Sequence, residues 1–297
     1  MKAIICIYSV VISLFLLTGC KDTEYLKTAG GMPYKLYKSK GGKKIVSGNF
    51  LKISATTMIG DSILYTTKEK LPFYQFVSPN SNPYDISELW TSLHLGDSVV
   101  ATQLVDTFIN RNPASVPPSF KKGDQILTYI KILEVFESDS ARMVDQAMEN
   151  KKWQEQEVTV VTKHLEEKNI KAQKTPGGAF VEIINPGEGS LIDSGNYVYV
   201  KYTGVSFSGV TFDSNIDSSF GHTEPLTFVV GTASMIKGFD EAMKFLKKGA
   251  VANIYIPSML AYGPSPQSPK IKPFEHIQFN VTITDVKDKA PLQPEPK

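Results

Sequence analysis

Cysteine and histidine are scarce in this chain of 297 residues, which contains two cysteines and four histidines. Two cysteines are too few for a disulfide-stapled small protein, so that class is excluded. No two histidines have a metal-ligand spacing such as H-x-x-x-H, and we expect no metal site and no cofactor. The sequence thus favours a reaction that needs neither a metal nor a cofactor.

The chain also has no large excess of charge of one sign, because 32 lysines and arginines nearly balance 30 aspartates and glutamates, for a net charge of +2. No run of basic residues of the kind that follows phosphates is present, so we expect no nucleic-acid partner. A G-x-S-x-G elbow, a G-x-x-x-x-G-K-[ST] loop and a G-x-G-x-x-G turn are absent as well. These absences disfavour hydrolases, nucleotidases and dehydrogenases.

One long apolar run stands near the N-terminus, at residues 3–17 after a lysine, and it is too short to span a bilayer. It leads into Leu-Thr-Gly-Cys at 17–20, and the whole segment resembles a bacterial lipoprotein signal. The resemblance implies cleavage after Gly19 and lipidation of Cys20. An ordinary secretory signal with a chance cysteine is the alternative. Because Cys6 leaves with the signal, the mature chain then has no free thiol.

Lipid on Cys20 would anchor the protein in the cell envelope, and we expect the outer membrane, facing either the periplasm or the cell surface. Each buried methylene adds about 0.8 kcal/mol of membrane affinity, so several acyl chains on one residue hold firmly. Residues 21–24 are mostly charged. They resemble the tags that send some Gram-negative lipoproteins to the surface, although a solvated tether explains them equally well.

Two regions of the chain show the same strand pattern. Residues 277–283 alternate between apolar and polar, as a half-buried strand requires, and so do residues 126–132, except that Thr128 interrupts the apolar face. Each strand follows a leucine-containing segment with a glycine, Gly96 or Gly249, which we expect at the C′ position of a short helix. We therefore predict an internal repeat of roughly 110 residues and two domains.

Residues 138–171 contain no glycine or proline, and their apolar residues recur at three-to-four spacing, which predicts an amphipathic helix. The polar stretch 149–157 breaks the apolar stripe, so we expect an interruption there and no continuous coiled coil. A solvated spacer is one interpretation of this segment, and a helix that joins two copies into a homodimer is the other. The proline-rich end of the chain predicts a disordered tail.

From about Gly187 to Val286 the sequence resembles the FKBP-type peptidyl-prolyl cis-trans isomerases, or rotamases. Four motifs in family order carry the resemblance: VYVKYTG at 198–204, VTFDS at 210–214, MIKGFDEAM at 235–243 and IPSMLAYG at 256–263. The resemblance implies an α+β fold, in which an antiparallel sheet wraps around a short helix. With the repeat, it predicts two FKBP-like domains joined by a helical linker.

The resemblance also implies a pocket for proline-containing polypeptides. Its catalytic residues would be Asp213, Tyr262 and Ile236. Its substrate-binding residues would be Tyr202, Phe212, Leu226, Met235, Phe239, Ile271 and Phe279. Phe239 stands where a tryptophan often forms the floor, and Leu226 where an aromatic residue often forms a wall. Both departures keep an apolar surface and bear on ligand preference more than on activity.

Such a pocket suits the chemistry of the X-Pro bond. Rotation about this amide crosses a barrier of about 20 kcal/mol, because the twisted state loses resonance. A dry aromatic pocket favours the twisted amide over the more charge-separated planar one, and no nucleophile is needed. The Tyr262 hydroxyl and the Ile236 N–H would hold peptide carbonyls. Asp213 would orient neighbouring groups or face the rotating carbonyl.

Composition alone also allows Phe212, Phe279 and Ile236 to be ordinary core residues. Tyr262 and Asp213 are different, because a buried phenol or carboxylate needs polar partners. Their presence among apolar residues therefore indicates a cleft.

The first region lacks these pocket residues under the same alignment. Tyr65 falls at the position of Asp213, Thr128 at that of Phe279, and TQLVDTFINRN at 102–112 replaces the Tyr-Gly segment. We therefore predict a degenerate FKBP-like domain that keeps the sheet and the helix but does not catalyse. It would bind, dimerise, or hold the catalytic domain away from the membrane.

The sequence predicts six segments. They are a lipoprotein signal peptide (1–19), a lipidated tether (20–30), the degenerate FKBP-like domain (31–137), the helical linker (138–172), the isomerase domain (173–287) and the disordered tail (288–297). The leading hypothesis is a prolyl isomerase that assists the folding of exported proteins. The alternatives are an FKBP-like chaperone or peptide-binding lipoprotein with little or no turnover, and an adhesin or nutrient-binding lipoprotein, which only the signal and tether suggest.

Overall fold

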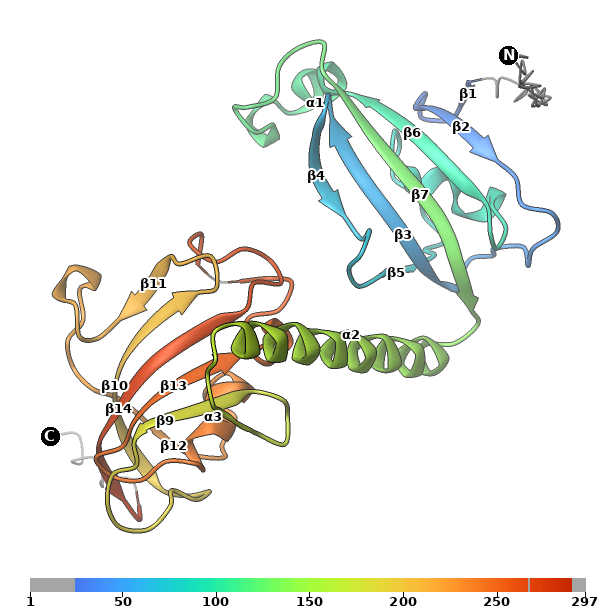
Figure 1. Cartoon of the computed structure of the whole chain (residues 1–297). Coiled ribbons are helices and arrows are strands. Elements are labelled where there is room, and N and C mark those ends of the chain that lie inside the picture. Colours follow the sequence, from blue (N-terminus) through green and yellow to red (C-terminus); the bar gives the residue numbers. More distant parts are fainter. Residues whose placement is uncertain (1–24, 267, 290–297) are drawn as a thin grey trace, which may run out of the picture. The chain divides into compact units, whose positions relative to one another are not determined.

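A computed structural model describes residues 25–266 and 268–289 of the chain (Figure 1). The predicted signal peptide, Cys20 and the tail from residue 290 lie outside the described residues. The chain divides into two compact units, one that ends at Asp145 and one that begins at Gln146. None of the described helices is long and apolar enough to cross a membrane.

The first unit is built on an antiparallel sheet of seven strands. These are β1 (Leu26–Lys27), β2 (Pro33–Tyr37), β3 (Phe50–Ile59), β4 (Ser62–Thr66), β5 (Phe73–Phe76), β6 (Ser98–Leu104) and β7 (Gln125–Phe136). Their order across the sheet is β1-β2-β6-β7-β3-β4, with β5 beside β3. The sheet thus includes β1, which falls within the segment expected to be a tether.

Alternating side chains make one face of this sheet apolar. Ile53 of β3 and Ile130 and Ile132 of β7 are buried. The 3-10 helix η1 (Ile86–Ser92) adds the buried residues Leu89 and Trp90 to the same core. Helix α1 (Val105–Arg111) and the 3-10 turn η2 (Pro113–Ser115) follow β6. The expected short helix is therefore a 3-10 helix in this unit.

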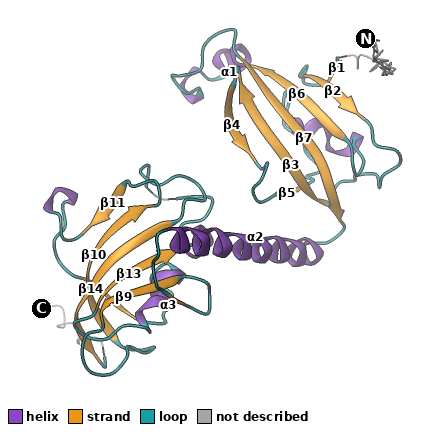
Figure 2. Cartoon of the chain, viewed as in Figure 1, coloured by secondary structure: helices purple, strands orange, loops and turns teal. Residues whose placement is uncertain are grey.

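The second unit repeats this arrangement (Figure 2). Its strands are β8 (Gln173–Lys174), β9 (Phe180–Asn185), β10 (Tyr197–Ser206), β11 (Thr211–Ser214), β12 (Leu226–Val229), β13 (Val251–Ile256) and β14 (Ile277–Lys287). They lie in the order β8-β9-β13-β14-β10-β11, with β12 beside β10. Strand for strand, this is the order of the first unit. The predicted repeat of one antiparallel topology is confirmed.

Gly96 and Gly249 occupy equivalent places in the two units. Both have a positive φ, 86° and 76°, as the sequence predicts. The expectation that they are helix C′ residues is wrong, because η1 and helix α3 (Lys237–Met243) end several residues earlier. Each glycine stands in the turn before a strand, β6 or β13, and its N–H donates to the last strand of its unit, β7 or β14. Gly96 donates to Ile132 O at 3.1 Å, and Gly249 to Ile283 O at 2.8 Å.

Helix α2 (Asp139–Glu167) is continuous, so the expected interruption at 149–157 is wrong. That stretch is polar, but most of its residues are lysine, glutamine and glutamate, which have high helix propensity, and loss of the apolar stripe does not end the helix. Near its end, Val161 and Leu165 are buried with Phe180 and Tyr255. This part of α2 packs on the second unit and is not a solvated spacer. A homodimer through α2 stays a prediction.

The sheet of the second unit is covered on both faces, because successive side chains of a strand point to opposite sides. Ile254 and Ile256 of β13 lie in the core with Phe239 of α3, whereas Tyr255 packs against α2. The alternating apolar residues of β14 are buried as predicted. These are Ile277, Phe279, Val281 and Ile283.

Glu88 connects η1 to the N-terminal part of the first unit. Its carboxylate accepts hydrogen bonds from the Thr28 hydroxyl (2.8 Å) and from the N–H groups of Gly30 (2.6 Å) and Tyr84 (2.7 Å). Burial opposes its ionisation, but these hydrogen bonds outweigh the burial. They lower the pKa of Glu88 below its ordinary value of 4.5.

A carboxyl group whose pKa is lowered by folding stabilises the fold above its ordinary pKa, and this contribution is lost as the pH falls through the folded-state pKa. We expect Glu88→Gln to destabilise the first unit at neutral pH, and the difference from wild type to shrink below pH 4.5. Urea unfolding followed by Trp90 fluorescence in a Trp153→Phe background measures this unit. A difference that stays constant with pH would contradict the prediction.

Candidate functional site

An open cleft of about 250 Å³ lies in the second unit. Strands β10, β11, β12 and β14 contribute to it, together with α3, the loop before α3 and the segment after η4 (Ser258–Leu260). Its lining residues are Tyr202, Asp213, Leu226, Ser234, Met235, Ile236, Phe239, Tyr262 and Phe279. The cleft therefore gathers residues from each of the four sequence motifs.

Aromatic rings in edge-to-face contact form the floor of the cleft. The centroid of the Phe279 ring lies 5.0 Å from that of Phe239, 5.6 Å from that of Phe212 and 5.7 Å from that of Tyr202. Phe239 and Phe279 are 3% and 5% exposed. Edge-to-face pairs of this kind contribute about 0.5–1.5 kcal/mol beyond the burial of their area. Phe279 is thus the centre of a rigid apolar surface.

Gly204 on β10 makes room for this cluster. A Cβ atom at this position would lie 2.6 Å from the Phe212 ring and 2.9 Å from the Phe279 ring, closer than real Cβ contacts allow. The glycine of the VYVKYTG motif is therefore required by the packing of two rings rather than by a turn.

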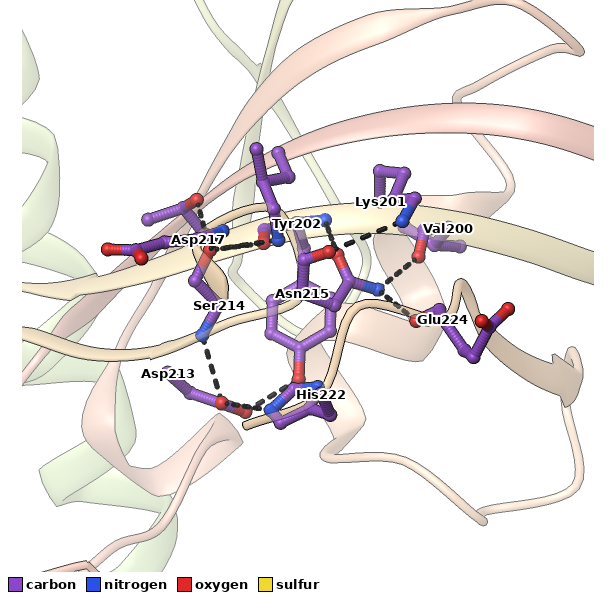
Figure 3. A network of polar contacts seen from close by, with 11 residues as sticks. Val200, Lys201, Tyr202, Asp213, Ser214, Asn215, Asp217, His222 and Glu224 are labelled. Atoms are coloured by element: carbon purple, nitrogen blue, oxygen red, sulfur yellow. Dashed lines mark hydrogen bonds and ion pairs between the residues drawn. The ribbon is translucent and has the colours of Figure 1, made fainter. Parts of the chain in front are cut away.

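Asp213 is held from two sides at the edge of the floor (Figure 3). The Tyr202 hydroxyl donates to Oδ2 at 2.6 Å, and the His222 ring nitrogen Nε2 lies 2.8 Å from Oδ1. Burial, and then the hydrogen bond to Asp213, raise the pKa of Tyr202 well above its ordinary range. Tyr202 therefore stays protonated as a donor, and the carboxylate of Asp213 has a fixed orientation.

Asn215 holds the loop that carries His222 (Figure 3). Its side-chain amide donates to the carbonyls of Val200 (2.9 Å) and Glu224 (3.0 Å), and its Oδ1 accepts from the Tyr202 N–H (2.7 Å). Only 1% of Asn215 is exposed. Because leaving such a buried group unpaired costs about 1–3 kcal/mol, the loop is fastened to β10.

Tyr262 faces the aromatic floor from the segment after η4. Its ring is perpendicular to that of Phe212, with an interplanar angle of 89° and a centroid distance of 6.2 Å. Burial and the charge of Asp213 raise the pKa of Tyr262 above the ordinary 10.0, so its hydroxyl remains protonated. The hydroxyl can therefore donate a hydrogen bond to a ligand in the cleft.

Most of the residues that the sequence predicts for the site line this cleft. Phe212 and Ile271 are buried in the same core, and they are not among the residues that line the cleft. Sequence reasoning missed Ser234, which lines the cleft, and His222, which contacts Asp213. An isolated histidine in an exposed loop carries no spacing signal, and it is the fold of the loop after β11, fastened by Asn215, that brings it to Asp213. The roles of all these residues stay predictions.

The strand registers show what stands at the same places in the first unit. Thr57 pairs with Tyr65 and Thr128, just as Gly204 pairs with Asp213 and Phe279. Helix α1 occupies the stretch that corresponds to the Tyr262 segment. The alignment that places Tyr65 at Asp213 and Thr128 at Phe279 therefore agrees with the structure. The equivalent positions in the first unit carry neither the aromatic floor nor the carboxylate.

Comparisons with known proteins concern mainly the second unit. The family described as FKBP-type peptidyl-prolyl cis-trans isomerase matches residues 189–284. The FK506-binding protein of Neisseria meningitidis is 33% identical over 110 residues, which cover 37% of this chain and 97% of that protein. The FKBP-type peptidyl-prolyl cis-trans isomerase FkpA of Escherichia coli strain K12 is 33% identical over 135 residues, 45% of this chain and 47% of that one.

The crystal structure of FkpA from Escherichia coli is 27% identical, with a TM-score of 0.38, and the match covers 50% of this chain and 68% of that one. The chain spans about half the length, or less, of several longer relatives that it matches. It covers nearly the whole Neisseria protein at 33% identity, and residues 189–284, which the family matches, include the cleft described above. The chain therefore belongs to the FKBP-type peptidyl-prolyl cis-trans isomerase family.

Proposed function

We propose that the second unit catalyses cis-trans isomerisation of X-Pro bonds and thereby assists the folding of exported proteins. One observation carries the proposal: a phenol and an oriented carboxylate stand beside an apolar floor of packed aromatic rings, in a cleft open to a polypeptide. Family membership supports the same reaction. The clients would be proline-containing polypeptides.

The aromatic floor would bind the proline ring and lower the rotational barrier. The planar amide is stabilised by resonance that separates charge, and an apolar surface stabilises that state less than water does. On leaving water for the cleft, the twisted amide loses less stabilisation by the solvent than the planar amide does, so the rotational barrier falls. Leu226, Met235 and Phe239 supply apolar contacts that exclude water from the rotating bond.

Three polar groups would orient the peptide. The Tyr262 hydroxyl, kept protonated by burial and by the charge of Asp213, would donate to a peptide carbonyl. The N–H of Ile236, directly before the first turn of α3, would hold a second carbonyl. Asp213, fixed by Tyr202 and His222, would face the rotating carbonyl or orient the groups around it.

Substitution of the polar pair tests this mechanism. We expect Tyr262→Phe and Asp213→Ala each to lower kcat/KM for a proline peptide about threefold to tenfold, because each removes one hydrogen-bonding group and leaves the floor intact. His222→Ala should have a smaller effect, because Tyr202 still holds Asp213. The measurement is a protease-coupled isomerisation assay on the full-length chain.

Two outcomes of this assay would count against the proposal in different ways. Wild-type protein that does not accelerate isomerisation above the uncatalysed rate would remove the catalytic function. Full activity in the double variant Tyr262→Phe, Asp213→Ala would keep the enzyme but exclude these residues from the mechanism.

A chaperone that binds unfolded chains with little turnover is a second candidate function. The observation that favours it is the edge strand β4 of the first unit, where Ile63, Leu64 and Tyr65 are 59%, 45% and 50% exposed. Apolar residues on a sheet edge can receive an extended polypeptide. If this function holds, the double variant Tyr262→Phe, Asp213→Ala should still suppress aggregation of an unfolded client, whereas Leu64→Lys should weaken suppression. If the double variant lost suppression of aggregation and Leu64→Lys kept it, the chaperone function of the edge strand would be contradicted.

We also propose that the protein is anchored in the cell envelope, at the outer membrane, through lipid on Cys20. The support is the lipoprotein-like signal at residues 3–20, and a protein named outer membrane protein MIP is among the relatives. In a bacterial host, the wild-type chain should incorporate labelled fatty acid and fractionate with membranes. Cys20→Ser should do neither. Equal labelling of the two chains would contradict the anchor.

A further inference from the structure

Glu157 is a buried carboxylate that the proposed mechanism does not use. It lies on α2, in the part of the helix that belongs to the second unit, and is only 4% exposed. An ionised group is costly to bury unless hydrogen-bond donors surround it. The hydrogen-bond donors to the Glu157 carboxylate come from its own helix and from the segment that leads to the cleft.

Three neutral donors hold the Glu157 carboxylate. The Ser258 hydroxyl donates to Oε1, and the Met259 N–H donates to Oε2 at 2.9 Å. The indole N–H of Trp153, one turn earlier on α2, donates to Oε1 at 2.8 Å. Hydrogen bonds to a charged acceptor are about twice as strong as neutral ones. Glu157 is therefore a firm anchor between α2 and η4.

The anchored residues begin the segment that carries the cleft tyrosine. Ser258 and Met259 open η4, and Tyr262 follows shortly after its end. The N–H groups of Ala261 and Gly263 both donate to the Ser258 carbonyl, each at 2.9 Å. A segment closed on itself in this way moves as one piece, so the place of Ser258 sets the place of Tyr262.

Other contacts fasten the same region to its surroundings. The Trp153 ring packs edge to face on Phe274, with centroids 5.5 Å apart. The His276 ring accepts the Ser258 N–H at Nδ1, 3.1 Å away. Burial lowers the pKa of His276, which keeps this ring neutral and able to accept. Ser258, itself fully buried, is thus held from α2 and from the residue before β14.

We propose that Glu157 is a positioning residue for the cleft: by holding Ser258 and Met259 from α2, it fixes the Tyr262 hydroxyl beside the aromatic floor. This inference rests on the proposed isomerase function of the cleft. It follows that α2 contributes to the proposed active site, because Glu157, about a hundred positions away in sequence, determines where the Tyr262 hydroxyl lies.

The test compares three single variants of the full-length chain. Glu157→Gln keeps the shape and removes the charge. Ser258→Ala removes one donor and leaves Glu157 in place, which keeps the test valid if Glu157→Gln does not fold. Glu155→Gln on the same helix is the matched control, because Glu155 is exposed. The measurements are kcat/KM for a proline peptide and hydrogen exchange of the backbone over residues 257–263.

We expect Glu157→Gln and Ser258→Ala to lower kcat/KM about threefold to tenfold, and the control to match wild type. Exchange over residues 257–263 should speed up, while exchange in β14 stays unchanged. The decisive readout is a double-mutant cycle with Tyr262→Phe. If Glu157 acts through Tyr262, the Glu157→Gln loss disappears in the Tyr262→Phe background, whereas a general loss of stability would lower activity equally in both.

Failure of this inference differs from failure of the proposed function. Additive losses in the cycle, or unchanged exchange over residues 257–263 in Glu157→Gln, would overturn the positioning role while wild-type activity stands. Wild-type protein without isomerase activity would overturn the proposed function and, with it, the catalytic meaning of the anchor. Exchange would still report whether Glu157 holds the segment.

Discussion

The cleft depends on the absence of a side chain at position 204. The rings of Phe212 and Phe279 both lie so close to Gly204 that a Cβ atom there would clash with them. Phe279 also packs against Phe212 and Phe239. The first unit has the same strand order but carries Thr57 at this position. Two copies of one topology therefore differ in whether aromatic rings can gather on the sheet. At these register positions the first unit has Thr57, Thr128 and Tyr65 in place of Gly204, Phe279 and Asp213.

The polar groups around the floor are held by buried hydrogen bonds of Asn215, by a part-buried hydrogen bond from Tyr202 to Asp213, and by an exposed contact between His222 and Asp213. Asn215 fastens the loop of His222 to β10, and Tyr202 and His222 together orient Asp213. Burial makes the Asn215 bonds important for stability, because a buried group without a partner loses its hydration and gains no bond in return. In the proposed mechanism, the aromatic floor would bind the proline ring, and the polar groups around it would orient the peptide.

Helix α2 is a connecting segment that also contacts the segment of the cleft tyrosine. Its polar middle stretch remains helical because helix propensity does not require an apolar stripe. Farther along, Val161 and Leu165 cover the face of the sheet opposite α3, and Glu157 reaches the segment of Tyr262. Apolar burial brings this helix to the sheet, and the carboxylate then specifies one position along it. The second unit includes the helix from Gln146 onward.

The sequence by itself determined the strand alternation, the repeat and most of the cleft residues, because these follow from local spacing and from four motifs in order. It also identified Gly96 and Gly249 as residues with positive φ, although not their place in a turn. Only the tertiary structure decided that Phe212 and Ile271 do not line the cleft, that His222 contacts Asp213, and that Glu157 contacts Ser258, 101 positions away. Such contacts arise from strand register, from the fold of a loop and from the packing of a helix on a sheet, none of which leaves a pattern in the local sequence.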